Sequence, residues 1–138
     1  MQSGAMYPDP QLLVHLCGTR DWQAAADSGR LTPESLLTSG FIHLSTQQQA
    51  HLPATRLFAG RDDVLAIYVD PQRLEAPVLW EPGLPDDPPS MRFPHLYGPL
   101  PLSAVDEVRP YPPQSDGTFA PLIHSGAGGT SSRSVTDC

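Results

Sequence analysis

The apolar residues of the chain fall into short runs separated by Gly, Pro and polar positions. Runs of four to six apolar residues rich in Val, Leu and Ile predict buried strands. The run at residues 64–69 is the clearest of them and predicts a central strand. We expect strands at residues 12–17, 41–44, 64–69, 78–81, 93–97 and 105–111.

Capping residues and helix breakers predict short helices between these strands. Each expected helix begins at a residue that favours the N-cap position, namely Asp21, Thr32 or Ser45. Ser45 has capping-box spacing to a later Gln, and Pro53 is expected to start a new turn. Helices are predicted at residues 21–27 and 32–37, and from residue 45 to about Gly60.

These elements predict a single α+β domain that spans residues 11–111. A chain of 138 residues suits one domain of ordinary size. Residues 1–10 are expected to form an N-terminal extension. Residues 112–138 are rich in Pro, Gly and Ser, which predicts a disordered tail. The pattern leaves open whether an apolar island at 119–123 docks on the domain.

Composition excludes several classes of function. Fifteen acidic residues against eight basic ones give a net charge of −7, which argues against nucleic-acid binding. All the basic residues are Arg, so a Schiff-base or P-loop lysine is excluded. Two cysteines are too few for a disulfide framework or a zinc ribbon. No signal peptide and no apolar run of about 20 residues is found. We expect a soluble, cytoplasmic protein with no membrane partner, and its oligomeric state stays open.

Three histidines lie within predicted strands. If the strands are neighbours, His15, His43 and His95 face one cleft and can act as general acids, bases or hydrogen-bond donors. The alternative is that each one satisfies a polar contact in the core. A three-histidine zinc site would need local ligand spacing that strand-separated histidines lack, so no metal is expected.

Ser45 and Thr46 follow His43 closely at the junction between a strand and a helix. The hydroxyls can serve as plain helix caps. Alternatively, they and the helix N-terminus hold an anionic group such as a pyrophosphate. His43 and Ser45 are two residues apart, so both are expected on the same face of the strand.

A second group of polar residues follows later in the chain. Glu81 ends a predicted strand, where it is either an exposed charge or a group that binds a ribose hydroxyl or stabilises a cationic transition state. His95 and Tyr97 alternate and therefore share a face, where Tyr97 either stacks in the core or lines an aromatic pocket. Arg92 is the cation best placed to meet a phosphate, the alternative being a solvated surface position.

Four sequence blocks carry a resemblance to a known family: GFIHLST at 40–46, LFAG at 57–60, WE at 80–81 and FPHLYGPL at 93–100. Over residues 11–111 the chain is similar to the bacterial and plant family called domain of unknown function 952. That family is remotely similar to the ADP-ribosyltransferase superfamily, which implies a small, twisted, split β-sheet core with short helices. It also implies that NAD binds in the cleft between the sheets.

The resemblance also implies roles for individual residues. His15 would occupy the first-strand position that meets NAD, and His43 with Ser45 the second-strand position. Glu81 or His95 would stand in the place of the third catalytic residue. The chain departs from the superfamily's arginine-serine-glutamate and histidine-tyrosine-glutamate patterns.

Three classes of function remain open at this point. The first is an NAD-using enzyme of the ADP-ribosyltransferase type. The second is an NAD-independent isomerase, cyclase or dehydratase that acts on a small metabolite in a specialised biosynthetic pathway. The third is a non-catalytic domain that binds a small molecule. The candidate catalytic residues are His43, His95 and Glu81, and the candidate cofactor-binding residues are His15, Ser45, Thr46, Arg92 and Tyr97.

Overall fold

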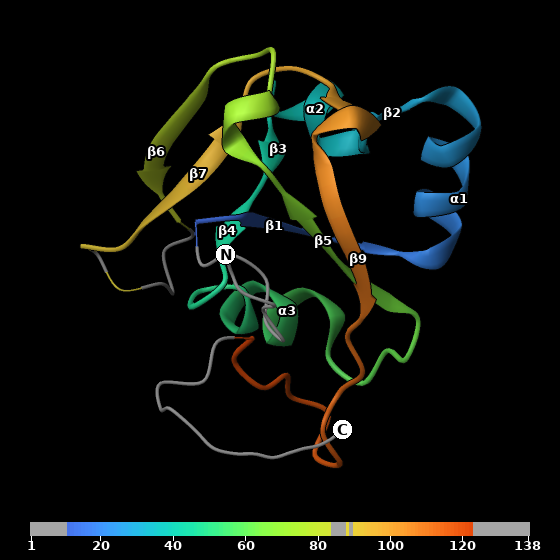
Figure 1. Cartoon of the computed structure of the whole chain (residues 1–138). Coiled ribbons are helices and arrows are strands. Elements are labelled where there is room, and N and C mark those ends of the chain that lie inside the picture. The colour runs from blue at the N-terminus through green and yellow to red at the C-terminus, as the bar shows by residue number, and fades with distance from the viewer. Residues whose placement is uncertain (1–10, 84–87, 89, 123–138) are drawn as a thin grey trace, which may run out of the picture.

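The structure is a computed structural model that describes residues 11–83, 88 and 90–122. Its elements alternate between strands and short helices along the chain (Figure 1). They are β1 (Leu13–Gly18), α1 (Thr19–Ser28), β2 (Arg30–Leu31), α2 (Glu34–Thr38), β3 (Ile42–His43), β4 (Ser45–Thr46), α3 (His51–Phe58), β5 (Val64–Val69), η1 (Pro71–Arg73), β6 (Val78–Pro82), β7 (Arg92–Leu96), β8 (Leu100–Pro101), η2 (Leu102–Ala104) and β9 (Val105–Pro110).

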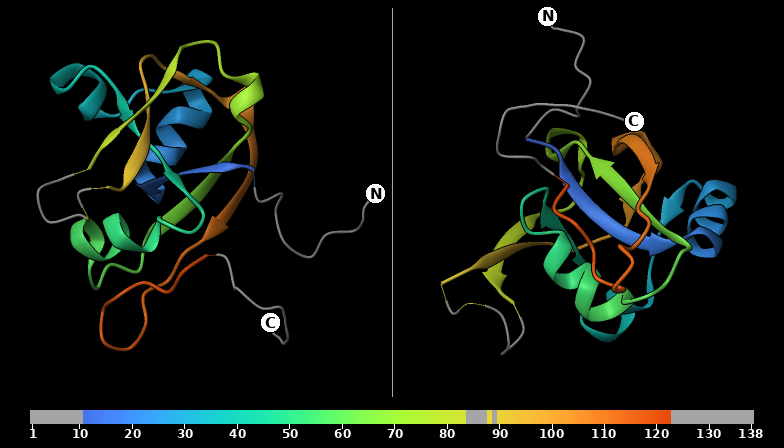
Figure 2. Two further views of the ribbon diagram at one scale, coloured as in Figure 1. Left: turned by 90° about the vertical axis from the view of Figure 1, so that its left-hand side faces the viewer. Right: turned by 90° about the horizontal axis from the view of Figure 1, so that it is seen from below.

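The strands form a four-stranded sheet in the order β4-β1-β5-β9 and a three-stranded sheet in the order β3-β7-β6. A short β2-β8 ladder completes the arrangement, and every ladder is antiparallel. The β6-β7 hairpin lies on the opposite side of the molecule from α1 (Figures 1 and 2). The predicted α+β fold is confirmed, with its strands divided between separate sheets.

The four-stranded sheet is covered on both faces. The first hydrophobic cluster includes Leu13, Ile42, Ile67, Val69 and Leu96. The second includes Val14, Ala54, Ala66, Tyr68 and Phe119. Alternate residues of β5 therefore contribute to opposite clusters, which explains why its sequence is continuously apolar. The prediction of a central strand at 64–69 is confirmed, since β5 pairs with β1 on one side and β9 on the other.

The segment after residue 41 differs from the prediction. Instead of one strand at 41–44, β3 belongs to the three-stranded sheet and β4 to the four-stranded one. The capping box joins Thr46 and Gln49: the Gln49 N–H donates to Thr46 Oγ1, and the Thr46 N–H donates to Gln49 Oε1. A turn follows, and α3 begins only at His51. Pro53 lies in the first turn of α3, where its missing N–H breaks no helical hydrogen bond.

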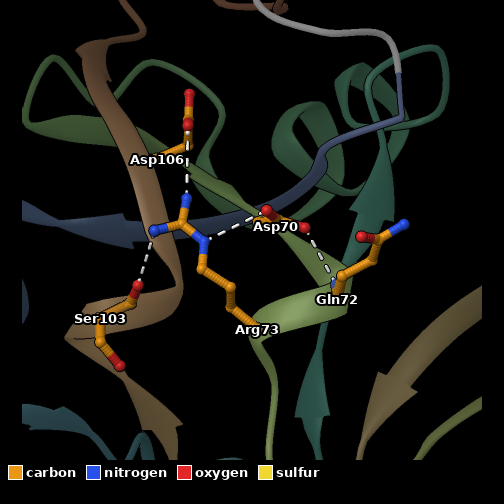
Figure 3. A network of polar contacts seen from close by, with 5 residues as sticks. All are labelled: Asp70, Gln72, Arg73, Ser103 and Asp106. Carbon is orange, nitrogen blue, oxygen red and sulfur yellow. Dashed lines mark hydrogen bonds and ion pairs between the residues drawn. The ribbon is translucent and has the colours of Figure 1, made fainter.

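A network of polar contacts joins η1, which follows β5, to η2 and the start of β9 (Figure 3). Asp70 accepts from the Gln72 backbone N–H at 2.9 Å and from Arg73 Nε at 3.1 Å. The Arg73 guanidinium also donates to the Ser103 carbonyl at 2.9 Å and to Asp106 at 3.4 Å. These side chains are partly exposed, so the network fixes the loop geometry more than it adds stability.

The chain after β9 packs along α3 (Figure 2). Phe119 is only 3% exposed, and its N–H donates to the Thr55 hydroxyl at 2.9 Å. The Gly60 N–H donates to the Gly117 carbonyl at 3.0 Å. The part of the apolar island up to Leu122 therefore docks, while residues 123–138 lie outside the described residues. No helix among the described residues is long and apolar enough to cross a bilayer.

We expect Phe119→Ala to destabilise the domain by about 3 kcal/mol, because it removes a buried aromatic ring and leaves a cavity beside α3. Chemical denaturation measures this change. Leu37→Ala is the control: Leu37 is 88% exposed, so its loss should change the free energy of unfolding by less than about 0.5 kcal/mol. Equal stability of Phe119→Ala and the unmodified protein would contradict the docking of this segment.

Candidate functional site

Strand pairing brings two of the predicted histidines together. The ladder between β3 and β7 places His43 directly opposite His95. Their rings meet edge to face, with centroids 5.5 Å apart and planes at 83°. Phe41 stacks on His95 with a centroid separation of 4.1 Å and an interplanar angle of 15°, and it also meets the His43 ring at 4.9 Å.

Glu81 joins this cluster from β6. One of its oxygens, Oε1, accepts from His95 Nδ1 at 2.8 Å and from the Tyr97 hydroxyl at 2.7 Å. These two hydrogen bonds, the Tyr97 bond first, lower the pKa of the Glu81 carboxyl. An ionised carboxylate can only accept, so Nδ1 of His95 carries the proton. No hydrogen bond joins the other ring nitrogen, Nε2, to another described residue.

His15 connects the two sheets. It lies on β1 in the four-stranded sheet, and its Nδ1 donates to the backbone carbonyl of His43 in the three-stranded sheet at 2.9 Å. The side chain is 6% exposed, and burial, as the largest cause, lowers the pKa of the imidazole. His15 is thus neutral at pH 7, with its proton on Nδ1. Its Nε2 is a buried acceptor with no partner among the described residues.

A cavity of about 650 Å³ lies along one edge of β1. β4 pairs only with Leu13 and Val14, so among the described residues no strand covers this edge from His15 onward. Residues of α1, α2 and α3 close the space around it. His15, His43 and Ser45 all line the cavity, as expected for His43 and Ser45 on one face.

The cavity wall also contains Cys17, a free thiol that is a nucleophile only when ionised. Burial, helped by the nearby Asp21 carboxylate, raises the pKa of the Cys17 thiol to about 12. The thiolate is therefore scarce at neutral pH, and Cys17 is a poor nucleophile. Among the described residues, no group of three or more His, Cys, Asp or Glu side chains is arranged to hold a metal ion.

The structure places the predicted site residues in two adjoining groups. His15, His43 and Ser45 line the cavity, while His95, Glu81 and Tyr97 stand beside His43, outside the cavity wall. The three strand histidines are therefore neighbours, but only His15 and His43 line the cavity, so the expectation that all three face one cleft holds for two of them.

Thr46 and Arg92 are not in the cavity wall. The Thr46 hydroxyl caps the Gln49 N–H, and the Arg92 carbonyl accepts from Gln49 Nε2 at 2.5 Å. The prediction that a helix begins at Ser45 is wrong, because α3 begins only at His51. The expected anion site at a helix N-terminus beside Ser45 therefore has no helix to form it.

Sequence reasoning missed Phe41 and two acidic residues of the cavity wall, Asp21 and Glu34. The position of Phe41 could have been predicted from the sequence, because it is two residues before His43 and the alternation of side chains along a strand puts both rings on one face. Asp21 was expected to cap its helix, but α1 begins at Thr19, so Asp21 lies in the first turn. Glu34 lies in the first turn of α2. Nothing in the sequence distinguishes these two acids from ordinary helix-terminal charges.

Known proteins share this fold. The chain is similar to the protein CC0527 from Caulobacter crescentus. The crystal structure of CC0527 aligns with a TM-score of 0.70 and 31% identity, over 79% of this chain and 93% of that one. Its solution NMR structure aligns with a TM-score of 0.66 and 31% identity, over 79% of this chain and 91% of that one. A comparison with curated proteins found no match.

A family model described as "Protein of unknown function (DUF952)" matches residues 16–108. The match begins at Leu16 within β1 and ends at Val108 within β9, and it contains every element between them. Because this match covers more than half of the sequence, the chain belongs to the DUF952 family.

Proposed function

We propose that this protein is a cytoplasmic enzyme that moves a proton on a small metabolite, in an isomerisation, cyclisation or dehydration of a specialised biosynthetic pathway. The observation that carries the proposal is the position of His43. His43 is a lining residue of the cavity, and its ring lies against the His95 ring, which Glu81 holds. A substrate in the cavity would therefore contact the imidazole of His43, which in turn contacts the imidazole of His95.

His43 suits the role of general base. Desolvation, the charge of His95 and the charge of Arg56 lower the pKa of its imidazole, in that order, although His43 as a whole residue is exposed. A His with a lowered pKa is uncharged at neutral pH and can accept a proton from a substrate. The ordinary histidine pKa already lies near neutrality, so a modest downward shift suffices.

Glu81 and Tyr97 act on the site through His95. The Glu81 carboxylate holds the His95 proton on Nδ1, which leaves Nε2 to exchange a proton. It also stabilises the positive charge that His95 acquires when protonated. Tyr97 donates to the same oxygen and thereby fixes the carboxylate. In this scheme Glu81 and Tyr97 are positioning residues, and His43 and His95 are the acid–base pair.

A second candidate is NAD-using chemistry of the ADP-ribosyltransferase type. What supports it is the division of the strands between two sheets, with His15 from one and His43 from the other lining a single cavity. This is the arrangement that the resemblance led us to expect for an NAD cleft. His15, His43 and Ser45 would then contact the dinucleotide.

We expect the enzyme to consume at least one compound of a bacterial metabolite extract, measured by mass spectrometry before and after incubation. His43→Gln should abolish this turnover, because it removes the general base that the proposal assigns. His95→Gln should lower it by at least about tenfold, since general acid–base catalysis typically contributes about 100-fold or more. His51→Gln is the matched control, because His51 lies on α3 outside the cavity wall.

Turnover that is equal in His43→Gln and in the unmodified protein would contradict the acid–base proposal. A compound that binds tightly and is returned unaltered would favour the non-catalytic binding domain instead.

The pKa of His43 should rise in His95→Asn. The Asn side chain can still donate to Glu81, but it removes the positive charge that opposes protonation of His43. NMR titration of the His43 ring protons measures this change without any substrate. In a turnover assay the acidic limb of the pH–rate profile should move to higher pH by the same amount. A His43 pKa that stays unchanged or falls would contradict the proposed coupling of the two rings.

The NAD candidate predicts a rise in melting temperature when NAD is added. A ligand at about 100 times its dissociation constant stabilises the folded state by about 2.7 kcal/mol. The shift should be smaller with nicotinamide alone and should disappear in His43→Ala. No stabilisation by NAD or ADP-ribose, together with no release of nicotinamide, would rule this candidate out.

A further inference from the structure

The edge strands of the two larger sheets differ in how well they are protected against pairing with another strand. β4 and β9 end the four-stranded sheet, and β3 and β6 end the three-stranded one. β3 and β4 have only two residues each. β9 is longer, but it carries Asp106, Glu107 and Arg109, and charges on an edge strand oppose association. β6 is the other long edge strand, and its five residues include one charge, that of Glu81.

The pairing of β6 with β7 shows which backbone groups of β6 face away from the sheet. Opposite residues of an antiparallel ladder alternate between hydrogen-bonded and non-hydrogen-bonded pairs. Trp80 lies opposite Pro94. Pro94 has no N–H, and its carbonyl accepts from the Leu44 N–H on the β3 side at 3.0 Å. Trp80 and Pro94 are therefore a non-hydrogen-bonded pair, and the N–H and C=O of Trp80 point away from β7.

The same alternation assigns the neighbouring residues of β6. Leu79 and Glu81 form hydrogen bonds with β7, while Val78 points outward like Trp80. Val78 and Trp80 therefore each present an N–H and a C=O on the outer edge, and Pro82 presents a C=O alone. These outward groups form no hydrogen bond with another described residue.

Exposed apolar side chains flank this edge. Leu79 is 48% exposed and Trp80 is 51% exposed, and consecutive residues of a strand point to opposite faces of the sheet. Figure 1 shows β6 on the outer side of the β6-β7 hairpin. An edge strand with unpaired backbone groups and large apolar side chains is a template for pairing with another strand.

A second copy of the chain matches this edge in an antiparallel register that places Val78 of each copy opposite Trp80 of the other. Opposite residues then exchange hydrogen bonds in both directions, so every outward N–H and C=O of Val78 and Trp80 gains a partner. Leu79 lies opposite Leu79 of the second copy, at a two-fold axis. A register with Trp80 opposite Trp80 is worse, because it sets the Val78 carbonyl against Pro82, which has no N–H.

The charges of the chain also favour a contact at this edge. The net charge is −7, so two copies repel each other unless weakly charged surfaces meet. The Glu81 carboxylate is held by His95 and Tyr97 of its own sheet. In the register described above, Glu81 lies opposite Pro77 of the second copy. Pairing through β6 therefore sets no two acids of the strand against each other.

We propose that the protein forms a homodimer in which the β6 strands of two copies pair antiparallel. The two three-stranded sheets then join into one sheet of order β3-β7-β6-β6-β7-β3. Each copy contributes a five-residue strand and two half-exposed apolar side chains. Contacts this small fall below about 1,200 Å² of buried surface, where association is weak and transient. We expect a concentration-dependent dimer with a dissociation constant of about 100 µM.

Hydrogen exchange of the β6 amides tests the proposal in the unmodified protein. NMR measures exchange at about 50 µM and about 1 mM protein, between which the monomer falls from about 60% to about 20% of the chains. Exchange of the Val78 and Trp80 amides should therefore slow by about threefold at the higher concentration. The Leu79 and Glu81 amides are the internal control, because they are bonded to β7 in both states.

A charge at the centre of the contact should weaken the dimer. Leu79→Lys places two like charges opposite each other, so we expect the dissociation constant from sedimentation equilibrium to rise by at least about tenfold. Leu37→Lys is the matched control, because it makes the same change at a residue of α2 that is 88% exposed. It should leave the dissociation constant unchanged.

A second pair of variants separates backbone pairing from side-chain burial. Trp80→Pro removes the outward N–H and breaks no hydrogen bond with β7, so an edge strand tolerates it. Trp80→Val removes the same indole but keeps the N–H. We expect Trp80→Pro to weaken the dimer more than Trp80→Val does.

A protein that stays monomeric up to about 1 mM would overturn the proposal and leave the edge of β6 to a different partner. A dimer that Leu79→Lys and Leu37→Lys weaken equally would overturn it as well, because the contact would then lie elsewhere. Protection of the Val78 and Trp80 amides that is the same at both concentrations would show that the edge is covered within one copy, which also contradicts pairing through β6.

Discussion

The site depends on a single stretch of backbone that belongs to two sheets. Residues 42–43 pair with β7, and residues 45–46 pair with β1. Leu44 connects these two pairs of residues and is only 2% exposed. Its N–H donates to the Pro94 carbonyl at 3.0 Å. Because backbone groups buried in this way must be paired, the path of this segment is strongly determined. The hydrogen bond from His15 to the His43 carbonyl then locks the two sheets together beside the cavity.

Several groups of the polar cluster pair with one another, which lowers the free-energy cost of burying them in so small a domain. Glu81, His95 and Tyr97 satisfy one another, and His15 uses one nitrogen on the backbone. Nε2 of His15 and Nε2 of His95 have no hydrogen-bond partner among the described residues.

Much of this arrangement could be predicted from the sequence, because it follows from short-range rules. Alternation placed His43 with Ser45 and His95 with Tyr97, and the apolar run at 64–69 identified the central strand. The division into β3 and β4 could not be predicted, since residues 41–44 have the pattern of one strand and Ser45 that of a helix start, and the division is decided by which neighbours pair with each segment. The cavity has the same origin: it exists because β4 is too short to cover β1, a property of the pairing and not of either segment alone.

Helix α3 contacts two different parts of the structure. Pro53, Leu57 and Phe58 contribute to the cavity wall, while Thr55 on the same helix accepts the backbone hydrogen bond from Phe119. One rigid element thus forms both the wall of a binding space and the dock for the end of the described chain. For any ligand that needs α3 in this position, binding and docking of the C-terminal segment are thermodynamically coupled. Docking of the segment raises the affinity for the ligand, and the bound ligand stabilises the docked segment against local opening by the same free energy.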